Sequence, residues 1–297
     1  MNLHYYLQLL INGLVVGGIY SLVALGFVVI YKATKVVNFA QGELVMVGAY
    51  VCFGLTVQLQ IPFVFAFLMT LCFSVVLGLA VERLALRPLI GESHICVIMV
   101  TIGLSSVLKS IVQLIWGTQI KVYPEVLPHT PLYLAGLPIA PVYIAAFVLS
   151  GVLFGVFSLF FKYSRMGIAM RATAHDQQAA QSMGIGIRGI FALSWCIACV
   201  VSAVGGVILG NINGINAHLG HLGLKVFPAV ILGGLDSLLG AALGGLIIGV
   251  LENICDGLAK DLFDLGGFRE VAAFVILVAI LMLKPYGLFG TEEIERV

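Results

Sequence analysis

The sequence predicts an all-α membrane protein, a polytopic transmembrane helical bundle of about eight spans plus a broken or re-entrant glycine-rich hairpin. Hydrophobic residues make up 61% of the 297 residues and charged residues only 10%, and the mean hydropathy is +1.13. A soluble domain carries about 25% charged residues, so this chain has too few charges to cover a water-exposed surface of its size. The 35 glycines suit close helix packing in lipid. Residues 1–297 are expected to form a single transmembrane domain.

Seven segments are assigned as individual spanning helices, for which about 20 apolar residues are needed. Backbone groups in lipid must satisfy their own hydrogen bonds, and no period-2 pattern favours a barrel, so helices are expected. The first segment has no Lys or Arg before it and is longer than the apolar core of a signal peptide, so it is expected to remain in the protein. The segments are Leu7–Ile30, Leu44–Val57, Phe63–Val81, Ile95–Trp116, Val142–Phe161, Ile190–Gly210 and Val271–Leu283.

Basic residues predict the orientation, because Lys and Arg accumulate on the cytoplasmic side of a membrane. If the spans alternate, three basic groups fall on one side and the N-terminus lies outside. The proline-containing interval 117–141 and the interval 211–220 then fall outside, the first as an irregular loop. The basic groups are Lys32 and Lys35 after the first span, Arg83 and Arg87 after the third, and Lys162, Arg165, Arg171 and Arg188 between the fifth and sixth.

The segment Leu222–Leu251 is too short for two full spans, which need about 40 residues. The acid-rich interval 252–270 that follows it is expected to be an outside loop, and the loop before it is also outside. We therefore predict a hairpin that turns near Gly233, Gly234 and Asp236, followed by a final span that leaves the C-terminus inside. The alternative is a single long tilted helix, which would leave the C-terminus outside.

A second irregular stretch, KVVNFAQGELVMVG, lies at residues 35–48. Interrupted segments at corresponding places in two halves of a transporter point to a pathway at the bilayer midplane. For Glu43, the alternative is a carboxylate that the dipole at the start of the second span favours without any functional role. The predicted translocation pathway comprises Asn38, Gln41, Gly42 and Glu43 of this stretch, and Gly233, Gly234 and Asp236 of the hairpin.

Lys109 is a charge within the fourth span, where a charge is costly unless it is paired or faces water. Ser105, Ser106 and Gln113 lie three or four residues from it, on the face that a helix would share with it. Lys109 is therefore expected to face the bundle or the pathway and is counted with the pathway residues. The alternative is that its side chain reaches toward the outer surface.

No catalytic residue, metal or cofactor is predicted in this chain. Cys196 and Cys199 have CxxC spacing, but they lie within an apolar span, where they are expected to pack. His218 and His221 have no third ligand nearby in the sequence, so they are expected to lie in a surface loop rather than to bind a metal. No Ser/His, paired Asp or HExxH arrangement supports an intramembrane enzyme, and the net charge of +1 argues against nucleic-acid binding.

The longest polar interval, Lys162–Arg188, carries four bases and one acid and is expected to be a cytoplasmic loop that docks on a partner. Residues Arg171–Met183 should form a short helix that ends at Gly184. The alternative is an amphipathic linker that lies on anionic lipid. In the docking interpretation, Ala179, Ala180 and Met183 enter a groove on the partner, and Arg171 and Asp176 make contacts at its rim.

Several motifs together resemble the LivH-type permeases of bacterial branched-chain amino acid ABC importers. NFAQGE at 38–43, followed by GAY at 48–50, resembles the signature of that family. In the polar loop, RATA at 171–174 and QAA at 178–180 with Gly184 resemble the EAA motif, although Gln178 replaces its Glu and the later IxLP element is absent. LGGL at 232–235 and KPYGLFG at 284–290 match the glycine-rich segment and the C-terminal element.

The resemblance implies a permease subunit of the bacterial inner (plasma) membrane that translocates leucine, isoleucine and valine delivered by a periplasmic binding protein. It implies a second related permease subunit, expected to form a heterodimer, and two cytoplasmic ABC ATPase subunits, with membrane lipid around the permeases. ATP and Mg would bind at the ATPases, because this chain has no GxxxxGK[ST] loop. Since the binding protein supplies selectivity, no high-affinity site is expected in the pathway. A urea or short-chain amide ABC permease is the alternative within the family, and a stand-alone secondary transporter or channel is the alternative outside it.

Overall fold

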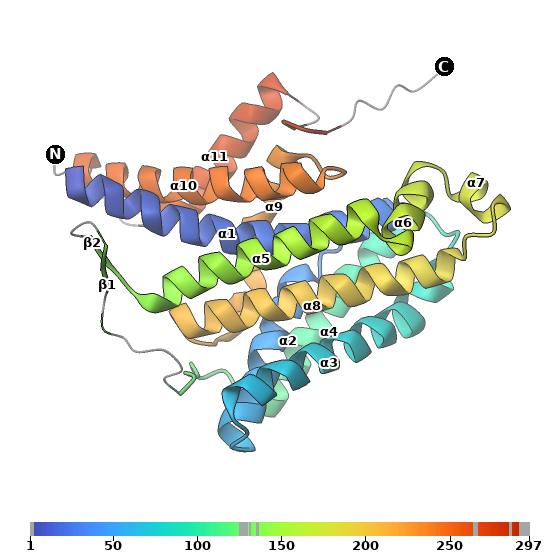
Figure 1. The fold of residues 1–297 in the computed structure, drawn as a ribbon, viewed down its shortest axis with the longest axis horizontal. Coiled ribbons are helices and arrows are strands. Elements are labelled where there is room, and N and C mark those ends of the chain that lie inside the picture. The colour runs from blue at the N-terminus through green and yellow to red at the C-terminus, as the bar shows by residue number, and fades with distance from the viewer. Residues whose placement is uncertain are drawn as a thin grey trace.

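The computed structural model describes residues 3–124, 130, 132–134, 137–263, 267–284 and 287–290. The described residues form eleven α-helices and one short two-stranded sheet (Figure 1). The helices are α1 Leu3–Thr34, α2 Gln41–Phe53, α3 Phe63–Val81, α4 His94–Trp116, α5 Pro141–Tyr163, α6 Arg165–His175, α7 Gln177–Ser182, α8 Ile187–Asn213, α9 Leu222–Gly233, α10 Leu238–Phe263 and α11 Phe268–Leu283. Shorter helical turns are η1 Gly54–Gln58, η2 Glu82–Leu86, η3 Arg87–Leu89 and η4 Ala217–His221.

The predicted all-α membrane class is confirmed. Six helices in the described part of the chain are long and apolar enough to cross a membrane, and two shorter apolar helices, Ala217–Gly233 and Val271–Leu283, accompany them. The predicted third span, Phe63–Val81, has the bounds of α3. The helix at the predicted second span starts earlier than predicted, at Gln41, and continues through η1 to Gln58, but it is not one of the six.

Helices α1 and α8 lie at the centre of the bundle. In their most apolar stretches, 89% and 83% of the residues are buried, whereas for α4 and α5 the share is 17%. α10 lies alongside α1 (Figure 1), and a Cβ at Gly13 would come within 2.8 Å of the Val250 Cα. The small residues of α1 therefore let the two backbones approach closely.

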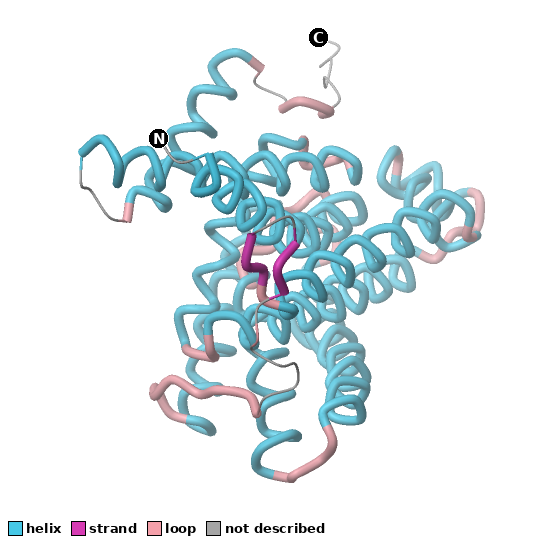
Figure 2. The backbone as a smooth tube through the Cα atoms, turned by 60° about the vertical axis from the view of Figure 1, so that its left-hand side comes forward, coloured by secondary structure: helices cyan, strands magenta, loops and turns pink. Residues whose placement is uncertain are grey.

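The proline-containing interval 117–141 is more ordered than predicted in its described part. β1 (Leu132–Leu134) and β2 (Leu137–Ile139) form an antiparallel hairpin, shown in Figure 2. Pro138 pairs with Tyr133 in this ribbon. Both strands are edge strands, where the missing N–H of proline is tolerated.

The acid-rich interval 252–270 is not the loop that was predicted. Helix α10 continues to Phe263 and includes Glu252, Asp256 and Asp261, while Asp264 lies outside the described residues. Glu252 and Asp256 are one helical turn apart on α10, and Glu252 is buried in the bundle. The number of charged residues alone therefore predicted an end for this helix that is too early.

The predicted turn in the glycine-rich segment is confirmed, and the hairpin around it has the predicted broken form. The chain breaks at Gly234, where φ is +99°, and this excludes a single long helix. α9 is short, whereas α10 is long enough to span. Because α10 extends beyond Leu251, the hairpin consists of one partial helix and one full helix.

The three basic groups meet at one end of the bundle, on the right of Figure 1. Lys32 interacts electrostatically with Arg171 of α6 and with Asp236 of the α9–α10 turn. The segment 287–290 also lies here, because the Leu288 N–H donates to the Leu232 carbonyl at 2.7 Å; Pro285 and Tyr286 of the C-terminal element lie outside the described residues. At the opposite end, the Tyr6 hydroxyl donates to Asp261 at 3.0 Å.

Candidate functional site

Helix α2 begins inside the bundle, not at its end. The segment between Thr34 and Gln41 runs back along α1, and a Cβ at Gly26 would overlap the side-chain Nε2 of Gln41. Gly26 lies eight residues before the end of α1, which corresponds to about 12 Å along a helix. The start of α2 is therefore an interruption within the apolar region.

Side chains satisfy the backbone at this interruption. The Asn38 Oδ1 accepts from the Ala40 N–H at 3.0 Å, and the Asn38 Nδ2 donates to the Gln41 Oε1 at 3.1 Å. The Gln41 Nε2 donates to the Ser202 Oγ of α8 at 2.7 Å. Asn38, Gln41 and Ser202 are all buried. The two predicted pathway residues Asn38 and Gln41 therefore hold the break together rather than exposing their polar atoms.

A second helix start meets the first. The Asn216 Oδ1 accepts from the His218 N–H at 2.9 Å, and the chain then turns through η4 into α9. A Cβ at Gly42 would overlap the Gly220 carbonyl oxygen and lie 2.7 Å from the Gly223 nitrogen. The two starts, which we call the central junction (residues 38–43 and 216–223), bring two partially positive helix ends together.

Charged side chains lie beside the central junction. The Glu43 carboxylate lies beside Ser105 of α4 and interacts electrostatically with Lys109 and His221. Ser105 and Lys109 are one helical turn apart on α4, and both are half-buried. Ser106 is exposed instead and bonds to the Ile102 carbonyl. Lys109 thus lies toward Glu43.

Sequence reasoning missed His221, which it assigned to a surface loop. Its imidazole is exposed and lies 5.7 Å, between ring centroids, from that of His218. The interaction with Glu43 joins residues that are far apart in the sequence. The available signal was the same one that marked the first break, an Asn followed by a glycine-containing helix start.

The other predicted pathway residues do not reach the central junction. Gly233, Gly234 and Asp236 lie at the basic end, beside Lys32 and residues 287–290. A Cβ at Gly234 would lie 2.6 Å from the Gly290 nitrogen. Helix α9 separates the two groups by about 18 Å along its axis, so the residues predicted as one pathway occupy two places.

The polar loop Lys162–Arg188 contains two helices rather than the predicted single helix 171–183. The break falls at Asp176, whose Oδ1 accepts from the Gln178 and Ala179 N–H groups at 2.8 and 2.9 Å. An Asp side chain competes with helix continuation and caps the next helix. Gly184 ends α7 with a φ of +83°, as predicted.

The residues predicted to dock are not equally accessible. Gln178, Ala179 and Gly184 are exposed, and Met183 is 84% exposed. Ala180 is only 4% exposed, so it packs within this chain. Arg171 donates from Nη2 to the Lys162 carbonyl at 3.2 Å, which ties α6 to the end of α5.

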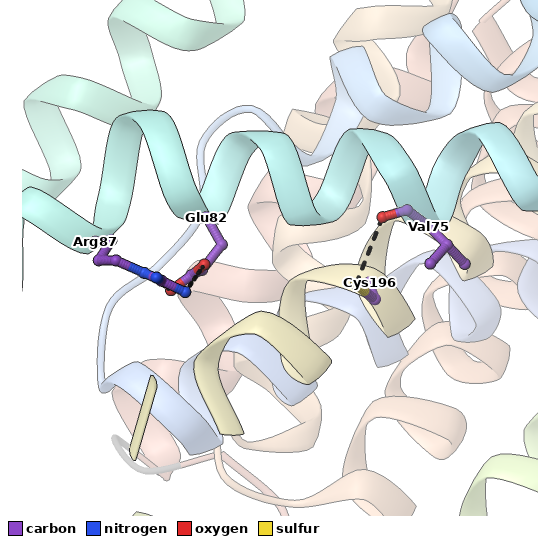
Figure 3. A network of polar contacts seen from close by, with 4 residues as sticks. All are labelled: Val75, Glu82, Arg87 and Cys196. Atoms are coloured by element: carbon purple, nitrogen blue, oxygen red, sulfur yellow. Dashed lines mark hydrogen bonds and ion pairs between the residues drawn. The ribbon is translucent and has the colours of Figure 1, made fainter. Parts of the chain in front are cut away.

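Cysteine and histidine pairs form no metal site in the described part of the chain, where no group of three His, Cys, Asp or Glu side chains converges. Cys199 is buried, and the Cys196 Sγ contacts the Val75 carbonyl at 3.5 Å (Figure 3). These cysteines lie where α8 packs against α3.

Comparisons with known proteins agree with this architecture. A family model described as "Branched-chain amino acid transport system / permease component" matches residues 9–283. The permease protein BraD of the high-affinity branched-chain amino acid transport system of Pseudomonas aeruginosa is 34% identical, over 100% of this chain and 99% of the relative. The corresponding protein LivH of Escherichia coli K12 is 31% identical, over 99% of this chain and 98% of the relative.

One solved structure shows the same fold at low sequence identity. PsaBC from Streptococcus pneumoniae in complex with Fab has a TM-score of 0.52 and 13% identity, over 95% of this chain and 93% of that chain. At this identity the likeness shows the fold alone. By its sequence, the chain belongs to the branched-chain amino acid transport system permease family and is a membrane-spanning component of an ABC transport system rather than a catalytic subunit.

Proposed function

We propose that this chain carries leucine, isoleucine and valine across the bacterial inner membrane after a periplasmic binding protein delivers them. The observation that carries the proposal is the central junction, where two helix starts meet beside Glu43 inside the helical bundle. An amino acid is a zwitterion on an aliphatic body. Its carboxylate is favoured by helix N-termini, and its ammonium group is favoured by Glu43.

The residues of the junction take different roles in this proposal. Glu43 is half-buried and His221 is exposed, so the charged face is accessible from outside the isolated chain. We expect the second, related permease subunit of a heterodimer to cover this face and to complete the pathway. Asn38, Gln41 and Gly42 hold the two helix starts in place, and Lys109 balances the charge of Glu43.

The loop Lys162–Arg188 is proposed as the coupling element for two cytoplasmic ABC ATPase subunits, which would hold ATP and Mg. Gln178, Ala179, Met183 and Gly184 are exposed on or directly after α7, and a protruding apolar side chain such as Met183 suits a groove on a partner. Asp176 holds the start of α7. Arg171 ties α6 to the end of α5, and this contact would fix the position of the docking segment relative to the bundle.

The basic residues at this end of the bundle also support an orientation of the chain in the membrane. The basic end would face the cytoplasm because Lys32, Arg171 and Arg87 gather there. The N-terminus would then lie outside. The segment 287–290 lies on the α9–α10 turn at the basic end, which supports a cytoplasmic C-terminus.

Uptake of labelled leucine by the assembled complex in proteoliposomes tests the proposal. The complex contains this chain, its sister permease, the ATPases and the binding protein. Glu43→Gln keeps the shape of the side chain and removes its charge, and charged hydrogen bonds contribute about 1.5–3 kcal/mol. We therefore expect uptake to fall by about tenfold or more. Asp261→Asn, a neutralised acid at the far end of the bundle, should leave uptake unchanged.

Three outcomes would contradict parts of the proposal. Normal leucine uptake by Glu43→Gln would remove the central junction from the pathway. Uptake of urea or short-chain amides in place of leucine would identify the other substrate class within the family. Leucine uptake without the ATPases would mean that the chain works as a stand-alone transporter.

A further inference from the structure

A separate cavity of about 230 Å³ lies at the basic end of the bundle. The end of α1, the segment before α2, the η2–η3 turns and the starts of α4 and α8 enclose it, and Gln177 of α7 lines it. We call it the basic-end cavity. Exposed residues Gly91, Glu92 and His94 belong to its lining, so a solute can reach it from the basic side. Of the central junction, only Asn38 lines it among the described residues.

Most of the wall is apolar. Ile30, Leu86, Val97, Phe191 and Trp195 come from four different helices or turns and line the same space. Pockets for drug-sized ligands measure roughly 300–1,000 Å³. This cavity is smaller, and its wall of branched and aromatic side chains suits a short aliphatic group.

One buried acid lies in this apolar wall. Glu82 is 1% exposed, and Arg87 donates from Nε and Nη2 to its two oxygens at 3.2 and 3.1 Å (Figure 3). A carboxylate has about four lone-pair sites, so each oxygen keeps capacity for another donor. Glu92 and His94 also line the cavity. The carboxylates of Glu82 and Glu92 in the lining can accept hydrogen bonds from a ligand with an ammonium group.

We propose that the basic-end cavity binds a small aliphatic amino acid, with its ammonium group on Glu82 and its side chain against Val97 and Trp195. The inference rests on the proposed function, because the ligand class is that of the imported substrate. The ion pair with Arg87 already occupies part of the carboxylate, and the ligand is small. Affinity is therefore expected in the range of about 1 mM, which corresponds to roughly −4 kcal/mol.

The position of the cavity suggests where in the transport path the proposed site would act. Gln177 lines it and donates to the Ala33 carbonyl at 3.5 Å, so α7 and the end of α1 meet at its edge. An amino acid that has passed the central junction toward the basic end would bind here, beside the proposed coupling segment. The site would therefore hold the substrate at its exit rather than at its entry.

Fluorescence of Trp195 offers a direct binding measurement on the full chain in lipid nanodiscs. The chain has two tryptophans, so Trp116→Phe leaves Trp195 as the only reporter. L-leucine is the probe, and 4-methyl-2-oxopentanoate, which has the same side chain but no ammonium group, is the control ligand. We expect a saturable change with leucine at millimolar concentrations and none with the keto acid.

Variants on α4 locate the site. Val97→Phe places a phenyl ring in the cavity and takes up the volume that the leucine side chain needs, so leucine binding should weaken by about tenfold or more, which is about 1.4 kcal/mol or more. Val100→Phe adds the same bulk one turn away, where Val100 does not line the cavity, and should bind like the parent chain. If thermal unfolding shows that Val97→Phe does not fold, Glu82→Gln is measured instead, and it should lose binding through the missing charge.

Several results would overturn the inference. These are the absence of a saturable signal, equal binding of leucine and the keto acid, and equal binding by Val97→Phe and the parent chain. Leucine uptake by the assembled complex separates the two proposals. Uptake without binding at the cavity refutes only the site, whereas binding without uptake refutes the proposed transport function.

Discussion

Two helix starts in this protein use the same local device in opposite surroundings. Before α2, the Asn38 Oδ1 accepts from the backbone N–H two residues later, at 3.0 Å. Before α7, the Asp176 Oδ1 accepts from the N–H two residues later, at 2.8 Å. Asn38 is 1% exposed and continues into a buried network, whereas Asp176 is exposed at the basic end.

A glycine lies near each of these helices, Gly42 in the first turn of α2 and Gly184 just after the end of α7, and the surroundings of the two glycines differ. Gly42 touches the backbone of Gly220 and Gly223, so even a methyl group would collide. Gly184 has a φ of +83° and nothing within 4 Å of the position of a Cβ. An Asx residue that caps a helix and a nearby glycine can therefore lie either at a buried contact between helices or at an exposed surface. The elements that pack beside them decide which.

The largest difference is expected between the two glycines. Gly42→Ala should lower the free energy of unfolding by about 3 kcal/mol or more, because its methyl group overlaps a backbone that cannot rotate away. Gly184→Ala should cost about 1–2 kcal/mol, the strain of a left-handed backbone. Thermal unfolding of the purified chain measures both effects.

Gly103→Ala is the control for that pair. Gly103 lies within α4 with nothing within 4 Å of its Cβ position, so alanine there should stabilise the helix by about 0.5–1 kcal/mol. If Gly42→Ala unfolded at the same temperature as Gly184→Ala, the contact between the two helix starts would not be as close as the structure shows.

A smaller effect is expected from the side chains that seal the first start. Gln41→Leu removes two buried hydrogen bonds and leaves Asn38 and Ser202 without these partners, at a cost of about 1–3 kcal/mol. Gln178→Leu, at the exposed start of α7, should change stability by less than about 0.5 kcal/mol. Adding Ser202→Ala to Gln41→Leu should recover part of the loss. Strictly additive costs in that double mutant would speak against a coupled network.

Apart from the control variants, the smallest effect is expected at the exposed cap. Asp176→Ala should cost about 1 kcal/mol, the usual loss of a helix cap, and should reduce the amount of ATPase that co-purifies with the chain because α7 frays. Asp176→Asn keeps an accepting oxygen and should retain both stability and ATPase. If Asn and Ala behaved alike, capping would not be what positions α7.

The sequence by itself determined the membrane class, most span positions and two of the places where helices break. Apolar runs and the scarcity of charge are local properties, so α3 could be bounded correctly, and the turn at Gly234 could be placed from its glycines. Local patterns were less reliable where two readings competed. The charges of α10 suggested a loop, although Glu252 is buried within a helix. The alanines near Ala179 suggested one helix, although Asp176 interrupts it.

Only the tertiary structure decided which breaks meet. Gly42 lies against Gly220 and Gly223, and Glu43 lies beside Lys109 and His221, while Gly233 and Asp236 remain at the other end of α9. These neighbours are distant in the sequence and come together through the packing of α2, α4, α8 and α9. The pattern within one segment specifies where its backbone needs a partner, but the partner is supplied by whichever helix packs there, and that depends on the whole bundle.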